Sequence, residues 1–171
     1  MACNQTLSGL ARDCSPSMGG IVEVLIANFS DVTAVGVTSD MITTITMASS
    51  AKFKKYEFAR NTGSLSSNYT IDQTSGVRFV TSDLVLQFNR METAKRVELS
   101  ALAQNDLRVI VKTANGNYFM LGKDEAVTAT AGDGLTGTAR GDRNGYSITL
   151  QDNSLEMPFE VDEDIISGLV G

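Results

Sequence analysis

The sequence predicts a mainly β protein: a β-sandwich or barrel with one long hairpin and one flanking α-helix at about residues 90–104. Two observations lead to this prediction. Apolar and polar residues alternate with a period of two in several segments rich in β-branched residues, which is the pattern of half-buried strands. Only residues 89–105 place apolar side chains along one side of a helix, so helix is expected to be the minor element.

The composition is that of a single globular domain. The chain has 171 residues, 42% of them hydrophobic, which suits one core rather than two independent cores. It shows neither an apolar run of membrane-spanning length nor the basic start and apolar block of a secretory signal. We expect synthesis in the cytoplasm, no membrane partner, an N-terminal arm at 1–20, one β domain at 21–161 and a C-terminal tail at 162–171.

Two short strands are predicted in the first part of the domain. Residues 21–29 (IVEVLIANF) place Val22, Val24 and Ile26 on one face by the period of two. Residues 39–47 (SDMITTITM) form the second signal, because they are rich in β-branched residues. Both strands are expected to lie in the core.

Residues 53–88 predict one very long hairpin. No proline interrupts them, and DQTSG at 72–76 supplies a turn that ends in glycine. Such a hairpin leaves unpaired backbone N–H and C=O groups along both long edges, and we expect these to pair with further copies of the chain. One face of the hairpin is polar and carries Ser64, Ser66, Asn68 and Thr70 on the first strand and Asp83 and Gln87 on the second.

The predicted helix follows this hairpin directly, with Asn89 as its expected N-cap. At 100° per residue, one arc of the helix is apolar, and we expect it to pack against a sheet. This expected core face consists of Met91, Ala94, Val97, Ala101 and Leu102.

The remaining chain continues the β pattern. Asn115-Gly116 lies between two apolar runs and predicts a tight hairpin. Residues 145–150 (GYSITL) alternate after Asn144-Gly145, where we expect a turn with positive φ. Residues 156–161 (EMPFEV) suggest a final edge strand, where Pro158 does little harm.

The residue content argues against an enzyme or a metalloprotein. The chain has no histidine, which removes imidazole acid–base catalysis and histidine metal sites, and no convincing pair of carboxylates stands out. Cys3 and Cys14 fit no zinc spacing, and we interpret them as reduced, idle thiols. We therefore expect no catalytic residue, no cofactor and no metal.

Short motifs in the chain are interpreted as local structure. The RGD tripeptide at 140–142 and the glycine-rich GDGLTG at 132–137 are expected to be surface loops, since neither has the context its function requires. Residues 142–153 lack the fifth and twelfth ligands of an EF-hand. Lys52, Lys54 and Lys55 form the tightest basic cluster and are expected on a solvated strand face or at a rim contact to an acidic neighbour. The net charge of −6 favours repulsion of phosphates.

Three segments resemble the tail tube, or major tail, proteins of bacteriophages, especially those that infect Bacteroidetes. They are KYEFARNTGSLSSNYTID at 55–72, GVRFVTSDLVLQFNRMETAKRVELSALAQNDLRVIVKTANGNYFMLG at 76–122 and GLTGTARGDRNGYSITLQDN at 134–153. The resemblance spans residues 19–161 and is carried by the order of long hairpin, helix, hairpin, glycine-rich loop and closing strands. It consists of patterns rather than catalytic signatures.

The resemblance implies a β-sandwich or barrel that assembles into rings, commonly hexameric, which stack into a hollow tube. The polar residues of the long hairpin, among them Asp83 and Gln87, would line the lumen through which double-stranded DNA passes without sequence-specific binding. The arm, the C-terminal tail and the hairpin tip would contact the next ring; the tip consists of Asp72, Gln73, Thr74, Ser75 and Gly76. Further partners would be terminator, tape measure and distal tail proteins, in a virion tail assembled in the host cytoplasm.

Two other functions remain open at this point. A head-to-tail adaptor, terminator or collar protein of the virion would use the same fold but form one ring that does not stack. A monomeric β-sandwich binding module, for carbohydrate or adhesion, would need a secretion route and exposed aromatic residues, and only 6% of the chain is aromatic.

Overall fold

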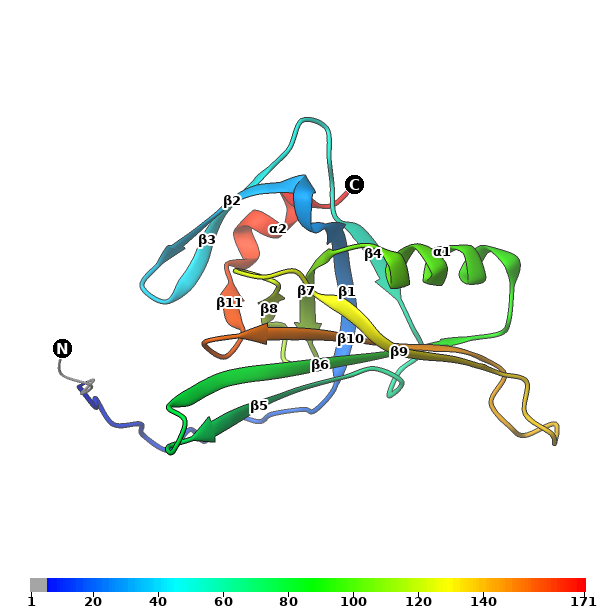
Figure 1. Ribbon diagram of the computed structural model, residues 1–171, viewed down its shortest axis with the longest axis horizontal. Coiled ribbons are helices and arrows are strands. Elements are labelled where there is room, and N and C mark those ends of the chain that lie inside the picture. The colour runs from blue at the N-terminus through cyan, green and yellow to red at the C-terminus, as the bar shows by residue number, and fades with distance from the viewer. Residues whose placement is uncertain (1–5) are drawn as a thin grey trace.

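The structure is a computed structural model that describes residues 6–171, and the chain forms two packed β-sheets with two helices (Figure 1). Cys3 lies outside the described residues. The predicted mainly β class with a flanking helix is confirmed. In Figure 1 the strands of the small sheet run horizontally below the large sheet, whose β1 and β7 cross them steeply.

The large sheet has seven strands in the order β2-β3-β11-β8-β7-β1-β4. All its pairings are antiparallel except that of β11 with β3. A short 3-10 turn (Phe29–Asp31) joins its first two strands. The strands are β1 (Ile21–Asn28), β2 (Val32–Thr38), β3 (Met41–Met47), β4 (Lys54–Glu57), β7 (Leu107–Thr113), β8 (Tyr118–Leu121) and β11 (Phe159–Val161).

The small sheet has four antiparallel strands in the order β5-β6-β10-β9. The predicted turn at 72–76 joins the first two. Its strands are β5 (Ser64–Asp72), β6 (Val77–Asn89), β10 (Gly145–Ser154) and β9 (Thr128–Leu135). The outer edge of β6 is occupied by β10 of the same chain, so the expectation that both long edges of the hairpin await another copy is wrong for this edge.

Two hydrophobic clusters lie on opposite faces of the large sheet. The first fills the space between the sheets and includes Val24 of β1, Leu84 and Leu86 of β6, and Leu150 of β10, all fully buried. The second lies on the other face of the large sheet, where Leu25 and Ile110 pack with side chains of the C-terminal helix. The large sheet is therefore covered on both faces, whereas the small sheet is covered on one.

Long-range pairing changes three local predictions about strands. A register shift between Ile21 and Glu23 puts Ile21, not Val22, on the inner face with Val24, so Val22 is 51% exposed. β4 pairs with β1 in the large sheet and does not belong to the long hairpin. β11 lies between β3 and β8, so its prediction as an edge strand is wrong.

The turn expected at Asn144-Gly145 also differs. Neither residue has a positive φ. Gly145 is required for a different reason, because a Cβ at this position would collide with the carbonyl oxygen of Phe88 on the paired strand.

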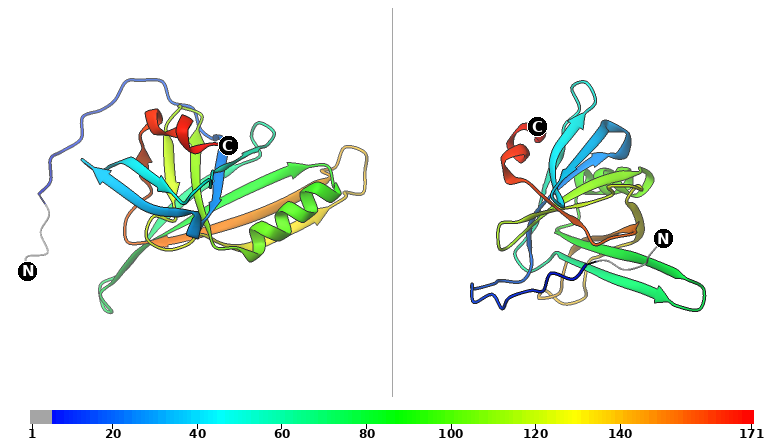
Figure 2. Two further views of the ribbon diagram at one scale, coloured as in Figure 1. Left: turned by 90° about the horizontal axis from the view of Figure 1, so that it is seen from above. Right: turned by 90° about the vertical axis from the view of Figure 1, so that its left-hand side faces the viewer.

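Helix α1 (Thr93–Gln104) lies along β9 and β10 (Figure 2), but it does not bury the predicted face. Of the five residues expected in the core only Leu102 is buried; Met91, Ala94, Val97 and Ala101 are exposed. Leu99 instead joins Leu102 at the first cluster. The helix starts after Glu92, because Asn89 still belongs to β6.

The C-terminal residues form helix α2 (Glu163–Leu169) rather than the predicted tail. Asp162 caps this helix by accepting a hydrogen bond from the N–H of Asp164. Ile166 and Leu169 are buried in the second cluster. At the other terminus, residues 6–20 carry no helix or strand and are exposed, and the arm is held where the N–H of Met18 bonds to Oδ1 of Asn115.

Candidate functional site

The face of the small sheet that points away from the large sheet is the most distinctive surface of the domain, and we call it the polar face. The register of the four strands brings its side chains together, on the side opposite the buried Leu84, Leu86 and Leu150. They are Ser64, Ser66, Asn68 and Thr70 on β5; Phe79, Thr81, Asp83, Val85 and Gln87 on β6; Ser147, Thr149, Gln151 and Asn153 on β10; and Thr128, Ala131, Asp133 and Leu135 on β9.

Cross-strand hydrogen bonds tie these side chains to one another. Nε2 of Gln151 donates to Oδ1 of Asp83 at 2.8 Å, and Oγ of Ser147 donates to Oδ1 of Asp133 at 2.7 Å. Oγ1 of Thr81 donates to Oδ1 of Asn153 at 3.0 Å. These donors are satisfied within the sheet, which leaves fewer of them for an outside acceptor.

The charge of the polar face is negative. Its ionisable side chains among the described residues are all acidic: Asp83 and Asp133 in its middle, and Asp72 at the end of β5; it carries no Lys or Arg. Arg143, in the loop after β9, lies with Nη2 3.7 Å from Oδ1 of Asp133, an ion-pair distance that is too long for a hydrogen bond. The face therefore repels phosphates weakly and offers them little to bind.

The structure places all six predicted lumen residues on this one face. The four predicted on β5 alternate with inward-facing residues, and Asp83 lies opposite Ser66. The prediction missed the residues of β10 on the same face. Their signal was present in the sequence, since polar Ser147, Thr149 and Gln151 alternate with apolar residues.

Both outer strands of the small sheet have a free edge. Within the part of the chain that the structure describes, β5 pairs only with β6 and β9 pairs only with β10. Because the sheet has four strands and every pairing is antiparallel, β5 and β9 run in opposite directions. A copy repeated in the same orientation would thus bring its β5 antiparallel to β9, the preferred hairpin-like pairing.

The strands of the small sheet are also offset along their length. β5 lies opposite Val77–Val85 of β6. β9 pairs with the part of β10 that itself pairs with Asp83–Asn89 of β6, so β9 lies level with these residues. The strand centres thus shift by five residues, from Thr81 to Leu86, in three steps. This is roughly 17 Å along the strands for roughly 14 Å across them, a slope of about 50°, near the 35–45° tilt of strands in closed barrels.

The predicted inter-ring residues form an ordered turn at one end of the small sheet. Oδ1 of Asp72 accepts the N–H of Thr74 at 2.9 Å, and its Oδ2 accepts Oγ of Ser75 at 2.7 Å. These hydrogen bonds, that of the Ser75 hydroxyl foremost, lower the pKa of Asp72. The turn lies at the opposite end of the sheet from the loop at 136–144 (Figure 1).

The glycine-rich segment at 132–137 was expected to be a surface loop, which is wrong for its first four residues, because they belong to β9. The basic cluster and the RGD tripeptide have structural explanations away from the polar face. Lys55 on β4 pairs with Glu23 and Glu57, both at 3.0 Å, and Lys52 donates to the carbonyl of Gly168. In the RGD loop, Asp142 accepts the backbone N–H groups of Thr138 and Ala139 and closes the loop on itself.

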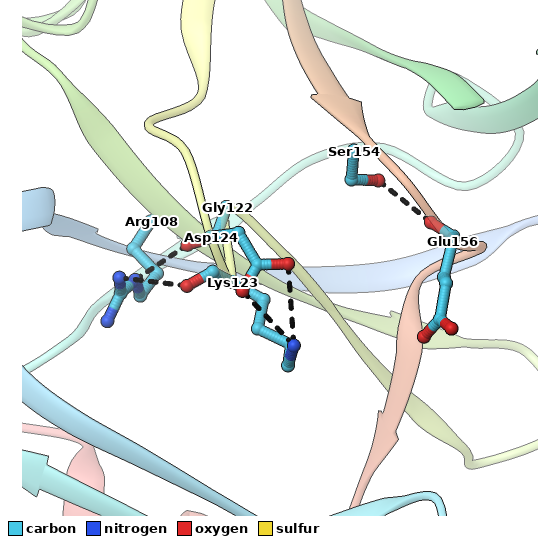
Figure 3. A network of polar contacts seen from close by, with 6 residues as sticks. All are labelled: Arg108, Gly122, Lys123, Asp124, Ser154 and Glu156. Atoms are coloured by element: carbon cyan, nitrogen blue, oxygen red, sulfur yellow. Dashed lines mark hydrogen bonds and ion pairs between the residues drawn. The ribbon is translucent and has the colours of Figure 1, made fainter. Parts of the chain in front are cut away.

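A buried polar network supports the turn after β8 (Figure 3). Arg108 is 5% exposed; its Nε donates to the carbonyl of Gly122 at 2.7 Å and its guanidinium stacks 4.2 Å from the ring centre of Phe29. Burial lowers the pKa of Arg108 and raises that of the nearby Asp152. Because these groups hold backbone and face the interior, we assign them a structural role.

Within residues 6–171, no cluster of three or more acidic or cysteine side chains is arranged to hold a metal ion. No helix in the described part of the chain is both long and apolar enough to cross a membrane. No protein-family model, curated protein or solved structure matches the chain.

Proposed function

We propose that this chain assembles head to tail into closed rings that stack into a hollow tube, and that the tube is a bacteriophage tail tube through which genomic DNA passes. The observation that supports this most is the small sheet with two free edges of opposite direction. Joining β9 of one copy to β5 of the next continues the antiparallel sheet, and the barrel-like slope of the strands favours closure.

The polar face becomes the inner wall in such a ring. The other face of the small sheet is already packed against the large sheet and α1, so only the polar face is available to line a channel. With six copies, as in the resembling family, the barrel would have about 24 strands, more than the 16–18 that already leave an aqueous channel.

The wall acts passively. DNA phosphates meet hydroxyl and amide groups, some of which are bonded to one another or to the acidic side chains Asp83 and Asp133. Without Lys or Arg on the face, no counterion release holds the DNA in place. The DNA slides without sequence-specific contact, in a virion tail whose terminator, tape measure and distal tail proteins meet the ends or the lumen of the tube.

Stacking of rings is assigned to the two ends of the small sheet and to the arm. The turn at 72–76 protrudes at one end and the loop at 136–144 at the other, and the exposed arm at 6–20 is held to the domain near Asn115. Residues 162–171 are not included in these contacts, because α2 is packed into the second hydrophobic cluster of its own domain.

Negative-stain electron microscopy of the purified protein over a concentration series tests the proposal. Stacked rings or filaments with a central channel are the expected result. Isolated rings would instead support the head-to-tail adaptor, terminator or collar function. Monomers at every concentration, confirmed by sedimentation, would rule out both.

A further inference from the structure

Two large apolar side chains are exposed on the β5–β6 hairpin, on the side of the small sheet opposite the polar face. We call this side, which faces the large sheet, the inner face. Tyr69 is 49% and Ile71 is 62% exposed, although both lie on the same face of β5 as Leu65, which packs against the core. They line an open hollow together with Met157 and Phe159, and no described side chain covers them there. The hydroxyl of Tyr69 has no hydrogen-bond partner among the described residues.

A groove lies on the same side of the sheet at the opposite edge. The inner face of β9 carries only Ala129, Gly132 and Gly134, beside Tyr146 and Ile148 of β10. Helix α1 forms the second wall, and the hollow between them has a volume of about 520 Å³. The helix contributes Arg96, Leu99, Ser100 and Ala103 to this wall.

Two charged residues, Arg96 and Asp133, line this groove. Oδ1 of Asp133 already accepts the hydroxyl of Ser147 and lies 3.7 Å from Nη2 of Arg143. By contrast, the guanidinium of Arg96 makes no ion pair and no hydrogen bond with any described residue. A guanidinium placed over the face of an aromatic ring is stabilised by the ring's electrostatic field, best when water is excluded. The groove therefore suits an aromatic side chain flanked by an aliphatic one.

The offset of the strands brings these two surfaces together. The centre of β9 lies level with Leu86 of β6, and each step to the next strand shifts the centre by about two residues. If β5 of a second copy pairs with β9 and continues this offset, its central residue Asn68 lies level with Phe88. Inner-face residues pair with inner-face residues, so Tyr69 comes level with Gly132 or Gly134.

We propose that the groove between α1 and β9 receives Tyr69 and Ile71 from the hairpin of a second copy, with Arg96 over the tyrosine ring. This inference rests on the strand pairing of the proposed function and adds the side-chain contact that fixes its register. Because donor and groove are different surfaces of one chain, each copy gives and receives, which produces a head-to-tail rather than a two-fold contact.

Three variants test the contact separately. The double variant Y69S/I71S removes the donor, and Ser100→Trp fills the groove from an exposed position of α1. Val97→Trp is the matched control, since Val97 is 54% exposed and does not line the groove. In sedimentation velocity over a concentration series, we expect the first two to raise the midpoint of assembly about tenfold to a hundredfold. The control should assemble as the unaltered protein does.

Mixing the two defective variants gives the decisive result. Y69S/I71S keeps its groove and Ser100→Trp keeps its hairpin. At a concentration below both raised midpoints, each variant alone should stay monomeric, whereas an equimolar mixture should form one-to-one dimers and nothing larger. Unchanged assembly of both variants, or a mixture that stays monomeric, would overturn the inference. If both variants still form tubes, only this inference fails; if the mixture dimerises while the unaltered protein never forms rings, the proposed function fails and this contact stands.

Discussion

Asp152 offers the sharpest test of how the domain is stabilised. Its side chain is 3% exposed, and its Oδ1 has no hydrogen-bond partner among the described residues. Burial raises the pKa of this carboxyl, and the negative charges of Asp124 and Glu125 raise it further; the nearby N–H of Gly122 opposes them only in part. At neutral pH the ionised form is therefore held in the fold at a cost.

The size and sign of the effect follow from this environment. An unsatisfied buried polar group costs about 1–3 kcal/mol, and more when it is charged. Asp152→Asn keeps the shape and the polar group but removes the charge, so it should raise the free energy of unfolding by about 1–2 kcal/mol at pH 7. A carboxyl with a raised pKa in the folded state binds more protons folded than unfolded, so stability is lost as pH rises from the ordinary pKa of 3.8 through the raised one. Below 3.8 the two proteins should be equally stable.

Urea unfolding of the two proteins at several pH values measures this difference. Asp106→Asn is the control, because Asp106 is exposed and should change stability by no more than about 0.5 kcal/mol. A gain from Asp152→Asn that is the same at pH 3 and pH 7 would show that the effect is not one of charge. A loss at pH 7 would show that the ionised carboxylate is stabilised in the fold, which contradicts this reasoning.

Two further predictions concern the polar face and the helix. Asp83→Lys should leave ring assembly intact and slow DNA delivery, because it puts a phosphate-binding cation on the wall; unchanged delivery would remove Asp83 from the lumen. Leu102→Ala should lower the free energy of unfolding by about 2–5 kcal/mol, since Leu102 is buried, whereas Val97→Ala should change it by no more than about 0.5 kcal/mol. Chemical denaturation measures the free energy of unfolding of both helix variants. Equal losses would show that Val97 is buried as well, as the sequence predicted.

The long hairpin was predictable because its information is local. The turn at 72–76 is stabilised by the side chain of Asp72 acting within the turn, and Gly76 has the positive φ of 70° that only glycine adopts easily. The alternation in β5 then determines which side chains share a face, whatever the sheet pairs with later. The grouping of Ser64, Ser66 and Asp83 needed nothing more.

What sequence could not supply is the identity of the partner element. The alternation of β1 indicates a strand, but the register shift that exchanges Val22 for Ile21 arises from pairing with β7. On α1 the apolar arc is weak, and the sheet selects Leu99 and Leu102 for burial in place of Val97. Helix α2 was missed because a seven-residue segment rich in acidic residues has little local signal, and burial of Ile166 stabilises it only after folding.

The contrast between the edges of the two sheets is the strongest reason to regard the small sheet as an assembly surface. Natural proteins protect the edges of their sheets with short strands, charges or irregularities. The large sheet follows this rule: β4 has four residues, including Lys54, Lys55 and Glu57, and two register shifts interrupt the pairing of β2 with β3.

The small sheet does not follow this rule at its two edge strands, β5 and β9. β5 is nine residues long with no charge before Asp72. β9 has one register shift, between Ala129 and Ala131, and then pairs regularly with β10 as far as Leu135, with Asp133 as its single charge. The contrast is clearest for β5, which is long, regular and uncharged up to Asp72, and β9 offers a regular stretch of five residues at the opposite edge. Because those two edges run in opposite directions on one sheet, the partner that satisfies both at once is another copy of the same chain.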